Sequence, residues 1–197
     1  MRRLFRNKKQ KSEQDETVII FHEDFYRQIE LVPVENYFER NSFIENLPDN
    51  AASEYGFEYC RARKEQPIKI SERKIYLEPI KELFTPLASD YFTHVEAAYG
   101  STVTYKKENT VVWGFDRYGV FAETDKDGIV ESIYLCQNNK FFIDNNGDTL
   151  SKALFLLGQQ YDLVLIDWNQ EIIIRFYSKP EIEKYLVKIL NFDVHSH

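Results

Sequence analysis

The sequence predicts an α+β fold: a single domain with a mostly antiparallel, twisted sheet and three to four helices packed on it. Two apolar, β-branched runs near the C-terminus, 163–167 and 172–177, are separated by only four residues, as in a hairpin. After Pro180 the apolar residues recur with the period of one helical face. These residues are Ile182, Tyr185, Leu186, Ile189 and Leu190. Short connections between strands favour antiparallel pairing over parallel βαβ order.

The N-terminal part of the chain is expected to be extended first and helical next. Residues 18–21 and 25–32 favour strands. The apolar spacing within 34–47 suits a helix bounded by Pro33 and Pro48, because proline is excluded from a helix interior.

Residues 67–77 mix β-branched and charged side chains, which favours an extended segment. Pro79 suits the first turn of a short helix, and Pro86 ends or kinks that helix. Residues 91–99 alternate as one strand, which is closed by 100–101.

The middle of the chain is predicted to be a meander of three strands, 110–115, 120–123 and 129–136. The turn at 125–128 ends in Asp-Gly, which suits the positive φ angles of a tight hairpin turn. A further short strand is expected at 141–143.

A helix is then expected to begin at Asp148 or Thr149, either of which can cap it. Its buried face comprises Leu150, Ala153, Leu154 and Leu157. The terminal strand, turn, strand and helix complete the predicted order.

Composition and length favour one globular domain over 18–197. Of 197 residues, 43% are hydrophobic and 15% aromatic, which is ample material for a core, and no Gly/Pro/Ser-rich linker divides the chain. Residues 1–17 are polar, charged and without periodicity, so we expect a disordered basic tail there.

Charge is distributed unevenly along the chain. Residues 1–11 contain six cations and no acid, a charge of +6. Because the whole chain has a net charge of −7, residues 12–197 carry −13. An acidic body disfavours nucleic-acid binding by the main domain, because phosphate contacts need clustered Lys and Arg. It suits a basic protein partner, although acidity also serves ordinary solubility.

No apolar run approaches the roughly 20 residues needed to span a bilayer, and none of signal-peptide length follows the basic N-terminus. The only cysteines, Cys60 and Cys136, are too few for a disulfide framework. These observations predict a cytoplasmic protein with reduced thiols.

Motifs for cofactors, metals and catalysis fail on spacing. The acidic stretches 125–128 and 144–148 lack the glycine at position 6 and the glutamate at position 12 of a calcium loop. The histidines have no zinc spacing, and neither GxSxG nor a phosphate-binding glycine loop occurs. We therefore expect no cofactor, no metal and no enzymatic activity, while a site dispersed over the fold stays open.

The two tryptophans are the best candidates for specific roles. Trp113 lies in a predicted strand and is first expected in the core. Trp168 lies in a turn beside acids, which favours exposure and resembles the anchor of an interface hot spot. The candidate partner-binding residues are Asp167, Trp168, Asn169, Glu171, Trp113 and Asp116.

Several short segments of the sequence together resemble the small α+β immunity proteins that protect bacteria from their own polymorphic secreted toxins. They are residues 25–33, 98–101, the meander around Trp113, and 166–168 before the closing hairpin and helix. The resemblance covers about residues 18–190 and fits no single family within this class. It implies a non-enzymatic protein that binds one cognate toxin and blocks its surface.

The predicted function is thus a cytoplasmic binding protein that neutralises a toxin, which the acidic body suggests to be basic and nuclease-like. The alternative is a scaffold or regulatory module that recognises a partner through an exposed sheet edge. A small hydrolase with dispersed residues is a third possibility.

Overall fold

The computed structural model describes residues 18–22, 26–37, 44–46, 61–63, 68–99, 103–115, 118–137, 147–170 and 172–192. The predicted tail at 1–17 and the predicted strand at 141–143 lie outside these residues.

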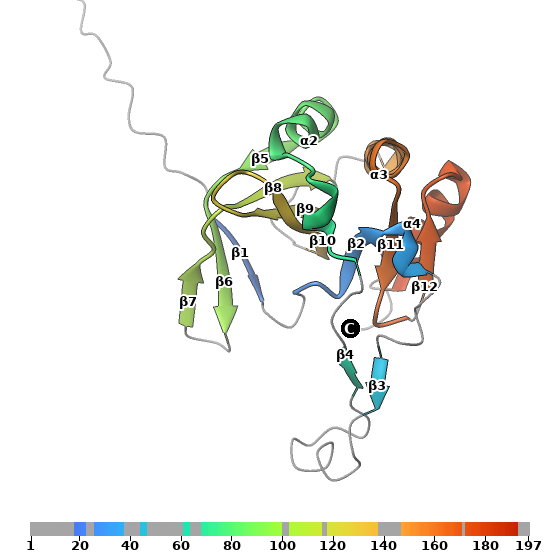
Figure 1. The fold of residues 1–197 in the computed structure, drawn as a ribbon, viewed down its shortest axis with the longest axis horizontal. Coiled ribbons are helices and arrows are strands. Elements are labelled where there is room, and N and C mark those ends of the chain that lie inside the picture. Colours follow the sequence, from blue (N-terminus) through green and yellow to red (C-terminus); the bar gives the residue numbers. More distant parts are fainter. Residues whose placement is uncertain are drawn as a thin grey trace, which may run out of the picture.

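A seven-stranded sheet, in which every neighbouring pair is antiparallel, forms the centre of the structure (Figure 1). In spatial order its strands are β12 (Ile172–Arg175), β11 (Leu163–Asp167), β2 (Ile29–Pro33), β10 (Val130–Gln137), β9 (Tyr118–Thr124), β8 (Thr110–Phe115) and β5 (Asp90–Phe92). Because β2 lies between β10 and β11, an N-terminal strand joins the central meander to the C-terminal hairpin.

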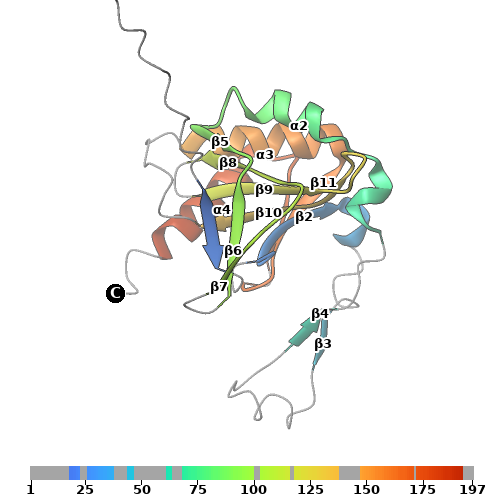
Figure 2. The same cartoon turned by 90° about the vertical axis from the view of Figure 1, so that its left-hand side faces the viewer.

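Two smaller sheets accompany the large one. In the first, β6 (Val95–Tyr99) pairs in parallel with β1 (Ile19–His22) and antiparallel with β7 (Val103–Lys106). The second is the antiparallel pair of β3 (Ile44–Asn46) and β4 (Arg61–Arg63), which projects away from the large sheet in Figures 1 and 2.

Three α-helices of the described chain cover one face of the large sheet. They are α2 (Leu77–Phe84), α3 (Gly147–Tyr161) and α4 (Lys179–Phe192). Their apolar residues share one core with alternate residues of the strands, such as Leu31, Trp113 and Leu165. In Figure 1, α2 and α3 lie above the sheet, while β1, β6 and β7 lie below it, on the face that we call the underside.

The β1-β6-β7 sheet, which we call the small sheet, covers the underside over β8, β9 and β10. Ile19 and Phe21 of β1 and Val95 and Ala97 of β6 form a second apolar cluster with underside residues of these strands. Those underside residues are Val112, Phe121, Tyr134 and Cys136. The aromatic rings of Phe121 and Tyr134 are stacked, with centroids 5.0 Å apart.

These elements confirm the predicted α+β class and its mostly antiparallel sheet. The meander, the helix after it and the C-terminal hairpin with its helix lie close to the predicted positions. The helix predicted at Pro79 is α2, which begins at Leu77 and is followed by a turn at 85–87.

The strand predicted over 25–32 begins at Ile29, because residues 26–28 form a turn. Three further local predictions were wrong. The helix predicted over 34–47 is a 3-10 turn, η2 (Val34–Tyr37), and residues 44–46 form strand β3. The extended segment predicted over 67–77 contains a second 3-10 turn, η4 (Ile70–Arg73). The strand predicted over 91–99 is broken at 93–94, so that its halves β5 and β6 belong to different sheets.

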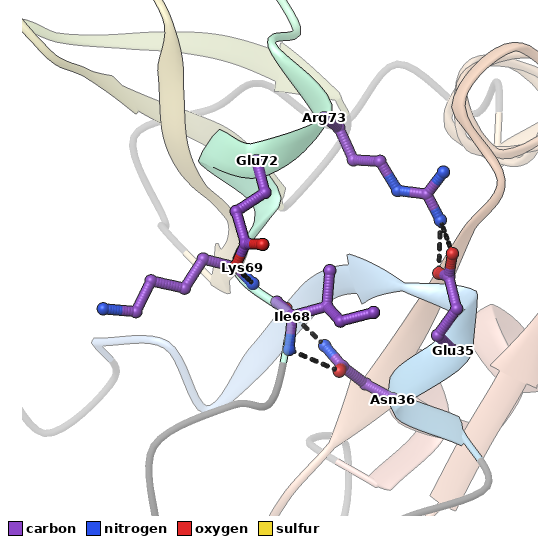
Figure 3. Close-up of polar contacts among 6 residues, drawn as sticks. All are labelled: Glu35, Asn36, Ile68, Lys69, Glu72 and Arg73. Carbon is purple, nitrogen blue, oxygen red and sulfur yellow. Dashed lines mark hydrogen bonds and ion pairs between the residues drawn. The ribbon is translucent and has the colours of Figure 1, made fainter.

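A set of polar contacts between η2 and η4 explains the first two of these three differences (Figure 3). The Asn36 side chain is buried and pairs with the Ile68 backbone, donating to its carbonyl at 2.8 Å and accepting from its N–H at 3.2 Å. Glu72 accepts a hydrogen bond from the Lys69 N–H at 2.9 Å, which closes η4 locally. Arg73 also pairs with Glu35. Side-chain bonds of this kind compete with regular helix and strand, and pattern reading does not register them.

Candidate functional site

The β6–β7 hairpin exposes three large apolar side chains on one face. Tyr99, Val103 and Tyr105 are 62%, 56% and 47% exposed. In the strand register Tyr99 lies opposite Val103, and Tyr105 lies opposite Ala97. Because opposite residues share a face of the sheet, the three side chains form one contiguous patch, which we call the hairpin face. Exposed apolar side chains that are contiguous mark interaction sites more often than scattered ones do.

The hairpin face is a continuation of a core surface. Val95 and Ala97 lie on the same side of β6 as the exposed Tyr99, and both are buried against the underside of the large sheet. Towards the end of β6 the hairpin extends beyond the large sheet, as Figures 1 and 2 show. The same alternation that buries the start of β6 therefore leaves its end uncovered.

A carboxylate on the underside anchors the base of the hairpin. Glu123 of β9 forms an ion pair with the Lys107 ammonium at 2.8 Å, directly after β7. It also accepts hydrogen bonds from the Ser132 and Tyr26 hydroxyls, both at 2.8 Å, and a longer one of 3.4 Å from the Tyr134 hydroxyl. These residues come from four separate segments of the chain, so the carboxylate ties the two sheets together.

The electrostatics of this anchor follow from burial and hydrogen bonding. Burial alone would raise the pKa of Glu123, but hydrogen bonds from Lys107 and Ser132 outweigh it and the pKa is lowered. Burial, assisted by the Glu123 charge, raises the pKa of the Tyr26 and Tyr134 hydroxyls. At neutral pH the carboxylate is therefore ionised and the two phenols are neutral donors.

Two cations flank the Tyr26 ring. The Lys107 ammonium lies 4.7 Å and the Arg27 guanidinium carbon 5.4 Å from its centroid, within the range of cation–π attraction. Arg27 has a φ of 54°, in the left-handed region that costs a non-glycine residue about 1–2 kcal/mol. Its Nε–H is buried and finds no hydrogen-bond partner among the described residues.

Trp168 lies farther along the underside and is partly buried, not exposed as its turn position suggested. Its indole N–H donates to the Glu30 carboxylate at 3.0 Å, and its ring packs beside Val32, Val164 and Ile166. Glu30 itself is only 3% exposed. Trp168 therefore satisfies a buried carboxylate, a structural role that sequence reading did not foresee.

The other predicted site residues are dispersed. Asp167 is buried on the helix-covered face, where it accepts a hydrogen bond from the Tyr185 hydroxyl at 2.7 Å. Trp113 is fully buried on the same face, which confirms the expectation that it lies in the core. Its ring centroid is 5.2 Å from that of Phe84. Asn169 is exposed in the turn after β11.

Asp116 and Glu171 lie outside the described residues. The structure thus does not bring the predicted residues into one surface, and the partner-binding role of Trp168 and Asn169 stays a prediction.

Sequence reading missed the hairpin face because it did not predict β7. A signal was present: 100–101 is a turn-forming pair, and it is followed by 103–106, in which three of four residues are β-branched or aromatic. The anchor at Glu123 had no comparable signal, because its partners are distant in sequence.

Within the described ranges, no group of three or more His, Cys, Asp or Glu side chains is placed to hold a metal ion. None of the helices described is long and apolar enough to cross a membrane. No protein-family model, curated protein or solved structure matches this chain.

Proposed function

We propose that this protein binds another protein through the hairpin face and catalyses no reaction. The observation that carries the proposal is the exposure of Tyr99, Val103 and Tyr105 on one side of an anchored hairpin. Tyrosine is enriched at interface hot spots because it offers a large apolar ring and a polar tip at a small entropic cost. Anchoring by Glu123 reduces the ordering cost of binding, because the base of the hairpin is already fixed.

We further propose that the partner is a bacterial toxin and that the protein is its immunity protein, acting in the cytoplasm by covering the toxin's surface. The sequence resemblance supports this choice. The −13 charge of residues 12–197 supports a basic partner, because opposite net charges speed the encounter of two proteins.

The test uses the C-terminal domain of the protein encoded immediately upstream, co-expressed with this chain in cells and titrated against it in vitro. We expect co-expression to restore growth and the purified proteins to associate, with an association rate that falls steeply with added salt. Tyr105→Glu places a charge in the hairpin face and is expected to weaken binding at least tenfold. Growth inhibition that this chain does not relieve would contradict the immunity role.

A second candidate is a scaffold or regulatory module, favoured by the position of β7 at the end of its sheet order. An extended peptide can add to such an edge as a further strand. The two candidates differ in partner: a scaffold would bind a protein of its own cell and leave the growth of toxin-expressing cells unchanged.

A further inference from the structure

Among the described strands, none pairs with the outer edge of β7, which is distinct from the hairpin face. β7 ends the order β1-β6-β7, and all four of its residues are exposed. The Lys107 N–H donates to the Val95 carbonyl at 2.8 Å, so Lys107 and Val95 form a hydrogen-bonded pair. In an antiparallel ladder the direction of the backbone groups alternates along each strand. The N–H and C=O of Val103 and Tyr105 therefore point to β6, and those of Thr104 and Lys106 point to the open edge.

We propose that a second copy of this chain pairs with this edge, so that two β7 strands lie antiparallel about a twofold axis at Thr104. The two sheets then form one sheet in the order β1-β6-β7-β7-β6-β1. The proposal does not depend on toxin binding, because it uses the backbone edge and leaves the hairpin face uncovered.

The sequence of β7 is self-complementary in this register. Thr104 lies opposite Thr104 of the other copy, and their outward backbone groups exchange two hydrogen bonds. Val103 of each copy lies opposite Tyr105 of the other, in the closely spaced type of pair where side chains touch most. Aromatic and β-branched cross-strand pairs of this kind stabilise sheets.

Charge also permits this register. A lysine on an edge strand commonly prevents pairing between molecules. Here the two Lys106 residues would lie four residues apart along the strands, roughly 13 Å, which exceeds the ~8 Å screening length at physiological salt. Within its own sheet each Lys106 lies opposite Glu96, so its charge has an acidic neighbour.

Pairing would also enlarge the hairpin face. One row of neighbouring side chains would run from Tyr99 and Val103 of one copy to Tyr105 and Ala97 of the other. The symmetry-related row would lie beside it. Two separate patches of three apolar side chains would then form one continuous face.

Sedimentation equilibrium of the purified full chain, followed into the high micromolar range, tests the association. High concentration is needed because so short a pairing buries less area than a standard interface. We expect the average mass to rise towards twice that of the monomer. Thr104→Pro removes the outward N–H but none of the bonds to β6, so it is expected to stay monomeric, while Thr104→Val keeps the N–H and associates. A constant monomer mass for the native chain would overturn the proposal.

Disulfide crosslinking tests the register and does not require the proline variant to fold. In a Cys60→Ser background, Thr104→Cys places two thiols on residues whose Cα atoms are about 5.5 Å apart, within disulfide range. Cys136 is buried and does not compete. We expect oxidised dimer for Thr104→Cys and none for Lys106→Cys. Crosslinking at Tyr105→Cys instead would overturn this register, and crosslinking at none of the three would overturn the pairing. Loss of toxin binding affects neither measurement.

Discussion

The two faces of the seven-stranded sheet are built on different principles. The helix-covered face is an apolar core in which strand residues such as Leu31 and Leu165 meet α3 and α4, and its buried carboxylate, Asp167, is bonded within that core to Tyr185 of α4. The underside also has apolar clusters, but it holds the buried carboxylate of Glu30 and the partly buried carboxylate of Glu123 beside them. Each of these acids is held by donors from distant parts of the chain.

The difference indicates a division of labour. Burying an acid costs free energy unless it is paired, so a fold gains little stability from placing two of them in its sheet. Paired with directional donors, however, such acids fix the position of what they bind. On the underside they fix the small sheet and the turn at Trp168, and the small sheet presents the hairpin face. The helix-covered face therefore mainly stabilises the fold, while the underside fixes the positions of the small sheet and of the turn at Trp168.

The largest expected effect is on the helix-covered face. Trp113→Ala removes a fully buried ring that contacts Phe84 and is expected to lower the free energy of unfolding by about 3–5 kcal/mol. Urea denaturation measures it. Tyr76→Ala, at a residue that is 53% exposed, is the control and is expected to cost much less. A loss below about 1 kcal/mol for Trp113→Ala would mean that this face is not the stabilising one.

A close approach between α3 and the chain after β12 gives the next effect. A Cβ added at Gly158 would lie 2.1 Å from the Phe176 Cβ, which forces the helix away from the sheet. Gly158→Ala is therefore expected to destabilise by about 1–3 kcal/mol, although alanine normally favours a helix by about 1 kcal/mol. A rise in melting temperature would show that α3 does not pack this closely.

On the underside, Glu123→Gln removes the charge that pairs with Lys107. We expect a loss of about 1–3 kcal/mol at pH 7, measured by urea denaturation, because the donors around Glu123 are partly buried. Glu131→Gln, at an exposed acid on the neighbouring strand, is the control.

The native protein and Glu123→Gln also test the pH dependence of the anchor at Glu123. The pKa of Glu123 is lowered in the folded state, so its contribution is present above the unfolded pKa and is lost as the pH falls through the folded pKa. The difference between native protein and Glu123→Gln should therefore shrink towards zero in acid. A difference that grows on acidification would reverse the assigned direction of the shift.

A smaller change is expected at Trp168→Phe, which keeps an aromatic ring but removes the donor to Glu30. Leaving this buried carboxylate one donor short should cost about 1–2 kcal/mol, seen as a lower urea midpoint. Unchanged stability would indicate that the hydrogen bond contributes nothing net, and Trp168 would again be free for a role in binding.

The parts of the fold that the sequence predicted correctly are those with local causes. The meander follows from short turns and β-branched runs, and α4 follows from its apolar period. The errors have non-local or side-chain causes. Asn36 pairs with the Ile68 backbone 32 positions away, and the strand predicted over 91–99 is divided between two sheets at 93–94.

For the candidate site, the sequence did not reveal the surroundings of the residues that it singled out. It placed Trp168 in a turn, where the structure also has it, but a turn position does not show which side chain the indole will reach. Asp167 precedes that turn as the last residue of a buried strand, and its parity places it against Tyr185 of α4. Even with β7 predicted, exposure at Val103 and Tyr105 would not follow from the sequence, because it depends on where the β1-β6-β7 sheet ends beyond the large one.

The most direct test compares two valines with equal exposure. Val103 on the hairpin face and Val187 on α4 are both 56% exposed. Lysine at either position should change the free energy of unfolding by less than about 0.5 kcal/mol, because neither side chain is in the core. In titrations with the C-terminal domain of the upstream gene product, we predict at least tenfold weaker binding for Val103→Lys and native affinity for Val187→Lys. Equal affinities of the two variants, with folding intact, would contradict the hairpin face as the binding surface.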